Sequence, residues 1–189
     1  MKIVQIGANR GSDDLTQIIN FNQPEILILV EPLKIHNETL NNSYSWVDNL
    51  KIENVVISNS KDKELEFFYH LDDGPGFEVS SLDIKHIYER HTHMNKERIT
   101  SIKVKNTTIN ELFDKYNLKK IDILFIDAEG SDDEIIKSIN FDDYDIQKIY
   151  FENIHIKDKN IYNFLIEKNY KITEKTGSNN WTSLAEKNN

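Results

Sequence analysis

The stretch VQIGANRGSDD, residues 4–14, decides the fold class. A short apolar segment runs into a loop bounded by Gly7 and Gly11, and acidic residues follow that can open a helix. A strand that ends in a glycine-bearing turn before a helix presents free backbone N–H groups at the carboxyl edge of a sheet. Ligands of open α/β sheets bind at that edge. We therefore expect a ligand to contact the backbone of residues 7–11.

Short apolar runs alternate with amphipathic stretches along most of the chain. The runs are rich in β-branched residues and too short for buried helices, which predicts strands. The amphipathic stretches carry apolar residues three and four positions apart behind Ser, Thr, Asp or Pro, which predicts helices. Such alternation specifies an α/β fold with a mostly parallel sheet covered on both faces. The expected strands are residues 2–6, 25–30, 54–58, 121–126 and 146–151, and the expected helices are residues 12–21, 32–42, 108–118 and 131–139.

The composition narrows the class of protein. A formal net charge of −9 argues against a nucleic-acid partner, because a surface that follows phosphates needs an excess of Lys and Arg. The absence of cysteine excludes disulfides and thiolate metal sites. No apolar run approaches the roughly 20 residues that span a bilayer, and the chain begins with a strand-like segment. We expect a single domain of 189 residues that is cytoplasmic and has no membrane partner.

Two regions depart from the strand–helix rhythm. Residues 64–105 hold an amphipathic strand, a Gly-Pro-Gly loop and a predicted helix at 83–94, which is long for a connection, so we expect a substrate-cap insertion at about residues 71–100. Its part from 85 to 105 carries six Lys and Arg residues against two Glu. The C-terminal segment is typical of a hairpin, which predicts an antiparallel C-terminal strand at one edge of the sheet.

The glycine loop does not fit a pyrophosphate. A dinucleotide site needs the pattern G-x-G-x-x-G, but here Asn9 places a side chain where the bare middle glycine belongs, and no Walker-type loop is present. Glu31 ends the second expected strand, twenty residues beyond Gly11, where a carboxylate can accept hydrogen bonds from a ribose diol. A nucleoside without a pyrophosphate, such as S-adenosylmethionine, meets both conditions. The alternative is that Glu31 only precedes a helix that starts at Pro32.

Several motifs resemble one enzyme family in their order along the chain. They are VQIGANRGSDD, VEP, NVVISNSKDKELEFF, SSL, TTINELF and IDAEGSDDEII, between about residues 3 and 155. This order is similar to that of the FkbM-type methyltransferases, which are class I S-adenosylmethionine-dependent enzymes. The resemblance implies a three-layer, Rossmann-like class I methyltransferase fold with a seven-stranded sheet. It also implies transfer of a methyl group to oxygen, typically on a sugar or a related small-molecule or glycan hydroxyl.

The resemblance also implies roles for individual positions, with S-adenosylmethionine as the cofactor. Gly7, Ala8, Asn9 and Gly11 would line its methionine part, Glu31 with Pro32 would hold the ribose, Ile57 and Ser58 would lie near the adenine, and Asp127 and Glu129 would face the methyl group. The chain departs from the family pattern at Phe125, where a Lys is common, and at Asn110, Asp132 and Ser138. Because the change at Phe125 removes a cation, we expect an acceptor that differs from that of typical members.

Acidic residues and one histidine at the expected strand ends are candidates for the chemistry. Transfer to a hydroxyl benefits from a general base within hydrogen-bond reach. Asp127 is the first choice, and Glu129 is the second because alternation along a strand points it to the other face unless Gly130 turns the chain. Glu152 and His155 follow the fifth expected strand, and His155 could act as a base. Asp127, Glu152 and His155 could instead bind a divalent cation, although we predict no metal.

The remaining predictions concern the acceptor. We expect Arg90, His91, His93 and Arg98 to meet an anionic or polyhydroxylated acceptor from the basic insertion. The carboxyls of Asp132 and Asp133 are interpreted as helix-start acids, and Trp181 as a packing residue.

Two other functions stay open. A nicotinamide-dependent oxidoreductase on a related Rossmann sheet is disfavoured by Asn9. A non-catalytic cofactor-binding protein derived from a methyltransferase is disfavoured because the glycine loop, Glu31 and Asp127 are present together.

Overall fold

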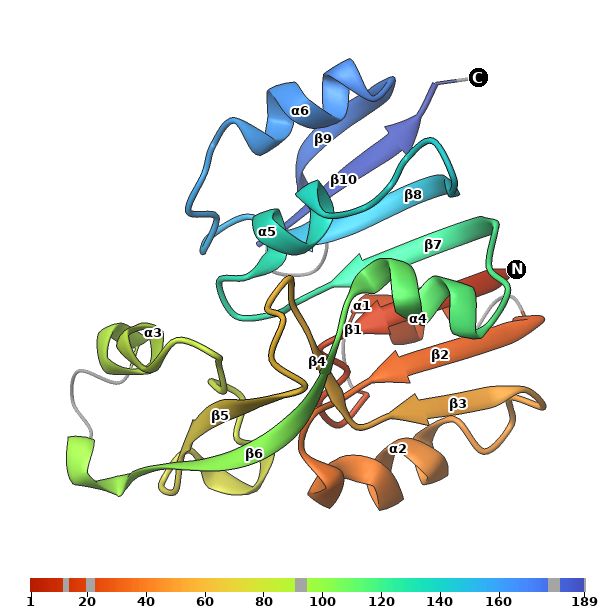
Figure 1. The fold of residues 1–189 in the computed structure, drawn as a ribbon. Coiled ribbons are helices and arrows are strands. Elements are labelled where there is room, and N and C mark those ends of the chain that lie inside the picture. Colours follow the sequence, from red (N-terminus) through yellow and green to blue (C-terminus); the bar gives the residue numbers. More distant parts are fainter. Residues whose placement is uncertain (12–13, 20–22, 91–94, 177–180, 189) are drawn as a thin grey trace.

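The computed structural model describes residues 1–11, 14–19, 23–90, 95–176 and 181–188. A seven-stranded sheet forms its centre, with the strand order β3-β2-β1-β7-β8-β10-β9 (Figure 1). The strands of this sheet are β1 (Lys2–Ile6), β2 (Ile26–Val30), β3 (Leu50–Glu53), β7 (Lys120–Ile126), β8 (Asp145–Glu152), β9 (Tyr170–Thr176) and β10 (Thr182–Lys187).

The central strand β1 pairs in parallel with β2 on one side and with β7 on the other, and β7 pairs in parallel with β8. The strand order therefore reverses direction at β1, and the carboxyl ends of β1, β2, β7 and β8 share one edge of the sheet. In open α/β sheets this edge, at the switch point, is where ligands bind. The topology places the glycine loop and the acids after β7 and β8 together.

Apolar residues on the two faces of the sheet form separate cores, which gives three layers. On one face, buried residues of β1, β2, β7 and β8 pack against α4, α5 and α6. On the other face, residues such as Ile3 and Leu27 pack against α1 and α2. All five residues of β2 are buried, as expected for a strand covered on both faces. The helices are α1 (Asp14–Ile19), α2 (Asn37–Ser43), α4 (Ile109–Lys115), α5 (Asp132–Lys137) and α6 (Ile161–Glu167), and the short 3-10 helix η1 (Lys34–His36) precedes α2.

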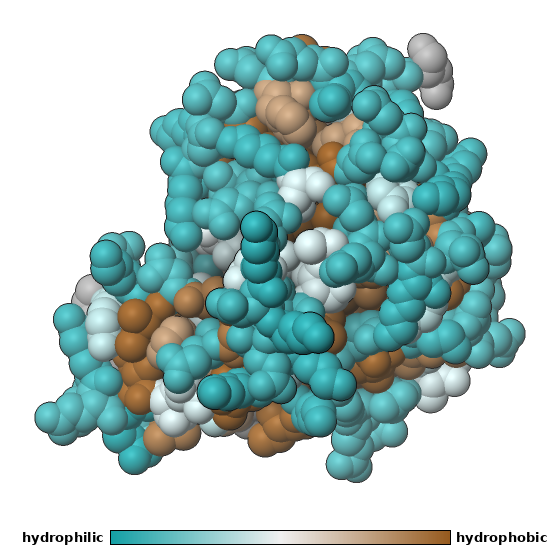
Figure 2. Space-filling view, in the orientation of Figure 1, coloured by the Kyte–Doolittle hydropathy of each residue, from teal (hydrophilic) through white to brown (hydrophobic). Residues whose placement is uncertain are grey.

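A small second sheet holds the segment between β3 and α4. Its strands are β4 (Val55–Ile57), β5 (Glu64–His70) and β6 (Ile99–Thr107), and it carries η2 (Gly74–Gly76), α3 (Ile84–Arg90) and η3 (Lys96–Arg98). Figure 1 shows this sheet and α3 beyond the arrowheads of β2 and β7. Figure 2 shows apolar residues gathered over α3 and β5 on this face, whereas the part around α6 is mostly hydrophilic.

One sequence prediction about the sheets needs correction, and one helix was not expected. The expected strand at residues 54–58 does not join the main sheet; β4 pairs with β6 instead, and β3 supplies the third parallel strand. The C-terminal hairpin forms the antiparallel edge of the sheet, as predicted, with β10 between β8 and the edge strand β9. Helix α6 has no counterpart among the expected helices. Local patterns do not specify which strand a segment joins, because pairing depends on contacts far along the chain.

The α/β, mostly parallel, seven-stranded and three-layer character of the fold is confirmed. Among the described residues, no helix is long and apolar enough to cross a membrane.

Candidate functional site

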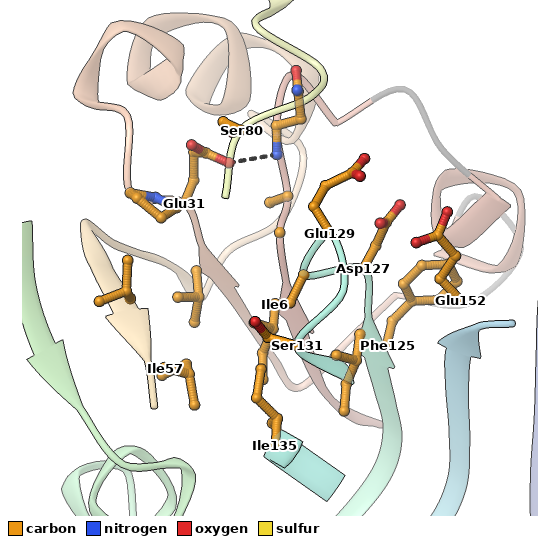
Figure 3. Close-up of a pocket in the computed structure, with 18 of the residues that line it drawn as sticks. Ile6, Glu31, Ile57, Ser80, Phe125, Asp127, Glu129, Ser131, Ile135 and Glu152 are labelled. Carbon is orange, nitrogen blue, oxygen red and sulfur yellow. Dashed lines mark hydrogen bonds between the residues drawn. The ribbon is translucent and has the colours of Figure 1, made fainter. Parts of the chain in front are cut away.

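A cavity of about 520 Å³ opens at the carboxyl edge of the sheet. Its lining comes from the loop after β1, the ends of β2 and β4, residues 78–82 of the inserted segment, and the ends of β7 and β8. This volume lies within the usual range of small-molecule sites. Of the site residues predicted from sequence, the lining includes Gly7, Ala8, Asn9, Glu31, Pro32, Ile57, Asp127, Glu129 and Glu152, most of which are drawn in Figure 3.

The glycine loop owes its shape to how closely the strands approach each other. Gly7 has a φ of 77°, and a Cβ there would stand 1.7 Å from the carbonyl oxygen of Asp127. Gly11 has a φ of 73°, and a Cβ there would stand 2.7 Å from the ring of Tyr44. Both positions therefore require glycine for steric reasons. The glycines position the loop, and Ala8 and Asn9 lie between them against the cavity.

Glu31 fastens this loop to the end of β2. Its two carboxylate oxygens accept hydrogen bonds from the backbone N–H groups of Asn9 and Leu33, each at 2.8 Å, and Figure 3 shows the first of these bonds. The side chain is 4 % exposed, and burial raises its pKa to about 7. Each oxygen retains a further lone pair for a hydroxyl donor. Glu31 is therefore more than a helix-start acid, and its position is compatible with the predicted contact to a ribose.

Of the two residues predicted to lie near the adenine, Ile57 and Ser58, only Ile57 lines the cavity. Ile57 lines it together with Val55 and Val56 of β4. Ser58 is absent from the described lining, and its hydroxyl bonds to Asn106 Oδ1 at 3.0 Å. The strand β4 therefore offers an apolar wall from the small sheet, and the sequence alone did not indicate that this wall belongs to a second sheet.

The chain after β7 turns so that both predicted acids face the cavity. Glu129 has a φ of 44° and Gly130 a φ of 87°, so two successive left-handed residues reverse the alternation of side chains. Figure 3 shows Asp127, Glu129 and Glu152 extending toward the same side. A left-handed conformation costs a residue other than glycine roughly 1–2 kcal/mol. Such strain is concentrated at functional sites, and Asn9, with a φ of 42°, is a second case in the same lining.

Asp132 connects the ends of two strands and is not simply a helix-start acid. One carboxylate oxygen accepts from the N–H of Ala128 and the other from the N–H of Glu152, each at 3.1 Å. The side chain is 2 % exposed. Burial, and then the nearby carboxylate of Glu152, raise its pKa to about 8. Asp133 is also buried and accepts from the N–H of Asp158. Both residues lie in the first turn of α5, as predicted, but they are also buried, because the chain after β8 folds over them.

His155 meets Glu152, and a second histidine joins them from the inserted segment. His155 Nδ1 lies 2.5 Å from Glu152 Oε2 and 3.8 Å from Glu129 Oε2. His86 Nε2, on α3, lies 2.8 Å from the same oxygen of Glu129. Sequence reasoning missed His86, because no motif or spacing distinguishes it from other residues of that helix.

Of the predicted acceptor residues, the structure describes the side chain of Arg98 alone, and that side chain is not at the cavity. Arg98 is exposed and forms a bidentate pair with Asp72, whose Oδ1 lies 2.8 Å from a terminal guanidinium nitrogen. It is absent from the described lining of the cavity. His91 and His93 lie outside the described residues, and only the backbone of Arg90, at the end of α3, is described. The prediction that Arg90, His91 and His93 meet the acceptor therefore stays a prediction.

Three aromatic residues line the cavity, namely Phe67 of β5, Phe125 and Trp181. Trp181, expected to pack, is 50 % exposed and stands in the lining beside Thr182. Phe125, which replaces the common Lys of the family pattern, is 4 % exposed and stacks on Tyr150 with ring centroids 5.8 Å apart. The apolar ring thus takes part in the strand packing between β7 and β8 while its edge reaches the cavity (Figure 3).

Comparisons with solved structures identify the class of fold. A precorrin-6y C5,15-methyltransferase from Geobacter metallireducens aligns with a TM-score of 0.50 at 12 % identity, over 99 % of this chain and 80 % of that one. A putative RNA methyltransferase from Pyrococcus horikoshii gives 0.44 at 11 % identity, over 97 % and 72 % of the chains. A fibrillarin/Nop5p complex gives 0.46 at 13 % identity, over 97 % and 70 %. The first of these alignments shows the Rossmann-like fold of a methyltransferase.

The family follows from the sequence itself. Residues 5–172 match the family model described as the methyltransferase FkbM domain. This chain belongs to that family of S-adenosylmethionine-dependent methyltransferases, and the resemblance inferred from its motifs is confirmed. No curated protein matches the chain. Family membership supports a methyltransferase over the nicotinamide-dependent alternative.

Proposed function

We propose that this protein transfers a methyl group from S-adenosylmethionine to a hydroxyl oxygen of a sugar or a related small molecule or glycan. One observation carries the proposal: a single cavity is lined on one side by the glycine loop and Glu31, and on the other by the carboxylates of Asp127, Glu129 and Glu152. A nucleoside donor and a hydroxyl acceptor therefore have adjoining places in it.

The cofactor side fits an adenosine-containing donor. Glu31 is a buried carboxylate with acceptor capacity left over, which suits ribose hydroxyls. The valine and isoleucine side chains of β4 offer an apolar wall for a base. When bound, S-adenosylmethionine supplies an electrophilic methyl group on a sulfonium sulfur. The residues of the chain have to bind the donor, align the acceptor and exclude water.

The acid side fits a hydroxyl acceptor. As the new O–C bond forms and the C–S bond breaks, the hydroxyl loses one proton, and Asp127 is our assignment for the group that takes it. Asp127 directly follows β7, beside the glycine loop, since its backbone N–H bonds to the carbonyl of Ile6 at 2.9 Å. Trp181 offers an exposed aromatic face at the cavity, which suits the C–H face of a sugar ring. We assign residues 71–100 as the cap over the acceptor.

Methyl transfer can be tested with isotope-labelled S-adenosylmethionine and a panel of sugars and glycan extracts. We expect label on an acceptor oxygen, identified by mass spectrometry of the product. Asp127→Asn should lower kcat by about 100-fold or more, while the affinity for S-adenosylhomocysteine, measured by calorimetry, stays within a few-fold. Trp181→Ala should raise the KM for the acceptor and leave cofactor affinity unchanged.

Glu134→Gln serves as the control, since Glu134 is exposed on α5 and absent from the described lining of the cavity, and it should change neither kcat nor cofactor affinity. Label on nitrogen or sulfur would contradict transfer to oxygen. Tight cofactor binding with no label on any acceptor would support a non-catalytic cofactor-binding protein instead.

A further inference from the structure

Four side chains meet at the mouth of the acid side, and we call them the histidine–glutamate cluster: His86, Glu129, Glu152 and His155. They come from three segments far apart in the sequence, namely α3, the turn after β7 and the end of β8 with the loop that follows it. One nitrogen of each histidine and one oxygen of Glu129 lie within 4.8 Å of one another. The two imidazole rings meet edge to face, with centroids 4.8 Å apart.

The four side chains of the cluster are largely buried, and a further carboxyl group lies close to them. The side-chain exposures are 8 % for His86, 18 % for Glu129, 11 % for Glu152 and 10 % for His155. The buried carboxyl of Asp132 lies close enough that the charges of Glu152 and Glu129 contribute to raising its pKa. Carboxylates gathered out of water stabilise a cation between them. The nearby Lys157 has its ammonium 3.7 Å from Asp83, on the insertion.

One ring nitrogen of His155 is paired with a carboxylate and the other has no partner among the described residues. Its Nδ1 pairs with Glu152 Oε2 at 2.5 Å, and its buried Nε2 has no hydrogen-bond partner among the described residues. Histidine ligands of metals typically give one ring nitrogen to a carboxylate, which fixes the ring, and the other to the ion. A buried imidazole nitrogen that has no partner costs free energy, and a bound ion would remove that cost.

The inserted segment is fastened to Glu129 in two places. His86 reaches its carboxylate, and the hydroxyl of the buried Ser81 donates to its backbone carbonyl at 3.1 Å. Gly130 permits the approach, because a Cβ there would stand 3.1 Å from His86 Nδ1. The left-handed turn at Glu129 and Gly130 is thus what brings the carboxylate to both histidines.

We propose that His86, Glu129 and His155 bind a divalent first-row transition-metal ion, with Glu152 orienting His155. Two imidazoles and one carboxylate favour ions such as Zn²⁺, Co²⁺ or Mn²⁺ over Mg²⁺ and Ca²⁺, which prefer ligand sets made of oxygen alone. Three protein ligands leave coordination positions open.

An ion at this position could assist the proposed methyl transfer. This part of the inference rests on that proposed function. Glu129 and Glu152 both line the cavity, so an ion held by the cluster would border the acceptor side. An ion there would bind the acceptor hydroxyl and ease the loss of its proton. It would also fix α3, and with it the cap, to the edge of the sheet.

Metal binding is measured first on the full chain, stripped with a chelator and without S-adenosylmethionine. Calorimetry with Zn²⁺, Co²⁺, Mn²⁺ and Mg²⁺ should give one site per chain, with Zn²⁺ and Co²⁺ bound at least about 100-fold more tightly than Mg²⁺. Pulsed electron paramagnetic resonance of the Mn²⁺-loaded wild-type chain should show coupling to imidazole nitrogen. This spectroscopic readout needs no variant and does not depend on activity.

The variants His86→Gln, Glu129→Gln and His155→Gln should each lower Zn²⁺ affinity by about 100-fold or more. Glu78→Gln, the matched control from the same cavity, should leave it unchanged. Circular dichroism verifies that each variant is folded. Absence of a site in the wild type, absence of nitrogen coupling, or equal affinity in all variants would overturn the inference and leave the four side chains as a hydrogen-bonded network. Metal binding without methyl transfer would contradict only the proposed function.

Discussion

The two sides of the cavity are built in different ways. The glycine loop and Glu31 of the cofactor side come from the ends of β1 and β2, which follow each other closely in the chain. Their shape is set by backbone: the carbonyl of Asp127 leaves no room for a side chain at Gly7, and Glu31 holds the N–H of Asn9. The acid side is assembled from three distant segments, and its shape is set by side chains such as His86 and Asp132. Substitutions on the cofactor side should therefore act mainly by introducing steric clashes with the backbone. Substitutions on the acid side should act mainly by changing the charge of buried side chains.

Gly7→Ala should have the largest effect. A Cβ at this position would stand 1.7 Å from a backbone carbonyl oxygen, so β1 and β7 would have to separate. We expect a loss of more than about 4 kcal/mol in the free energy of unfolding, or no folded protein. The measurement is denaturant unfolding followed by circular dichroism.

Gly74→Ala is the matched control for that variant. Gly74 has a similar φ of 74°, but nothing lies within 4 Å of an added Cβ. Only backbone strain of about 1–2 kcal/mol is expected there. Equal losses at the two positions would show that conformation, rather than the close approach of the strands, accounts for the glycine at position 7.

Glu31→Gln should weaken cofactor binding by roughly tenfold to 100-fold, because hydrogen bonds to a charged group are lost. Burial raises the pKa of Glu31 to about 7, so the carboxylate that accepts hydroxyl donors is lost as the pH falls below this value. Wild-type affinity for S-adenosylhomocysteine should therefore fall from pH 8 to pH 6, by up to about tenfold per pH unit. Calorimetry at several pH values measures this.

The affinity of the Glu31→Gln variant should change little over the same pH range. Glu53→Gln, at the end of the neighbouring strand β3, is the control, since Glu53 pairs with Lys115 and Tyr116 and is absent from the described lining of the cavity. A wild-type affinity independent of pH would contradict the ribose assignment.

Asp132→Asn should change how stability depends on pH. The folded pKa of Asp132 is raised from an ordinary value of 3.8 to about 8, so the folded state holds a proton that the unfolded state releases. The free energy of unfolding should therefore fall, by up to a few kcal/mol, as the pH rises from about 4 to 8. The variant should show a shallower fall, measured by urea unfolding at several pH values.

Glu134→Gln, an exposed change on the same helix, controls for net charge. An identical pH slope in wild type and Asp132→Asn would show that other groups carry the dependence.

Arg98→Ala should have the smallest effect. Arg98 pairs with Asp72 on the surface of the insertion, and exposed pairs contribute little. We expect no measurable change in Tm, in cofactor affinity or in the KM for the acceptor. A clear rise in that KM would restore the basic insertion as the acceptor site.

The sequence by itself determined the fold class, the family and most of the cofactor side. The strand-and-helix alternation and the loop at Gly7 to Gly11 are local patterns, and Glu31 follows from its position after the second strand. Local patterns suffice here because β1 and β2 are neighbours in both sequence and space.

The sequence also indicated Asp127, Glu129, Glu152 and His155, but the tertiary structure alone decided how the acid side is assembled around them. It placed β4 in a second sheet, inserted β10 inside the first, buried Asp132 and carried His86 to Glu129. No local pattern specifies these arrangements, because they are created by segments that meet only when the chain has folded. Burial and long-range contact, which set the pKa of Asp132 and bring the two histidines together, are properties of the packed molecule.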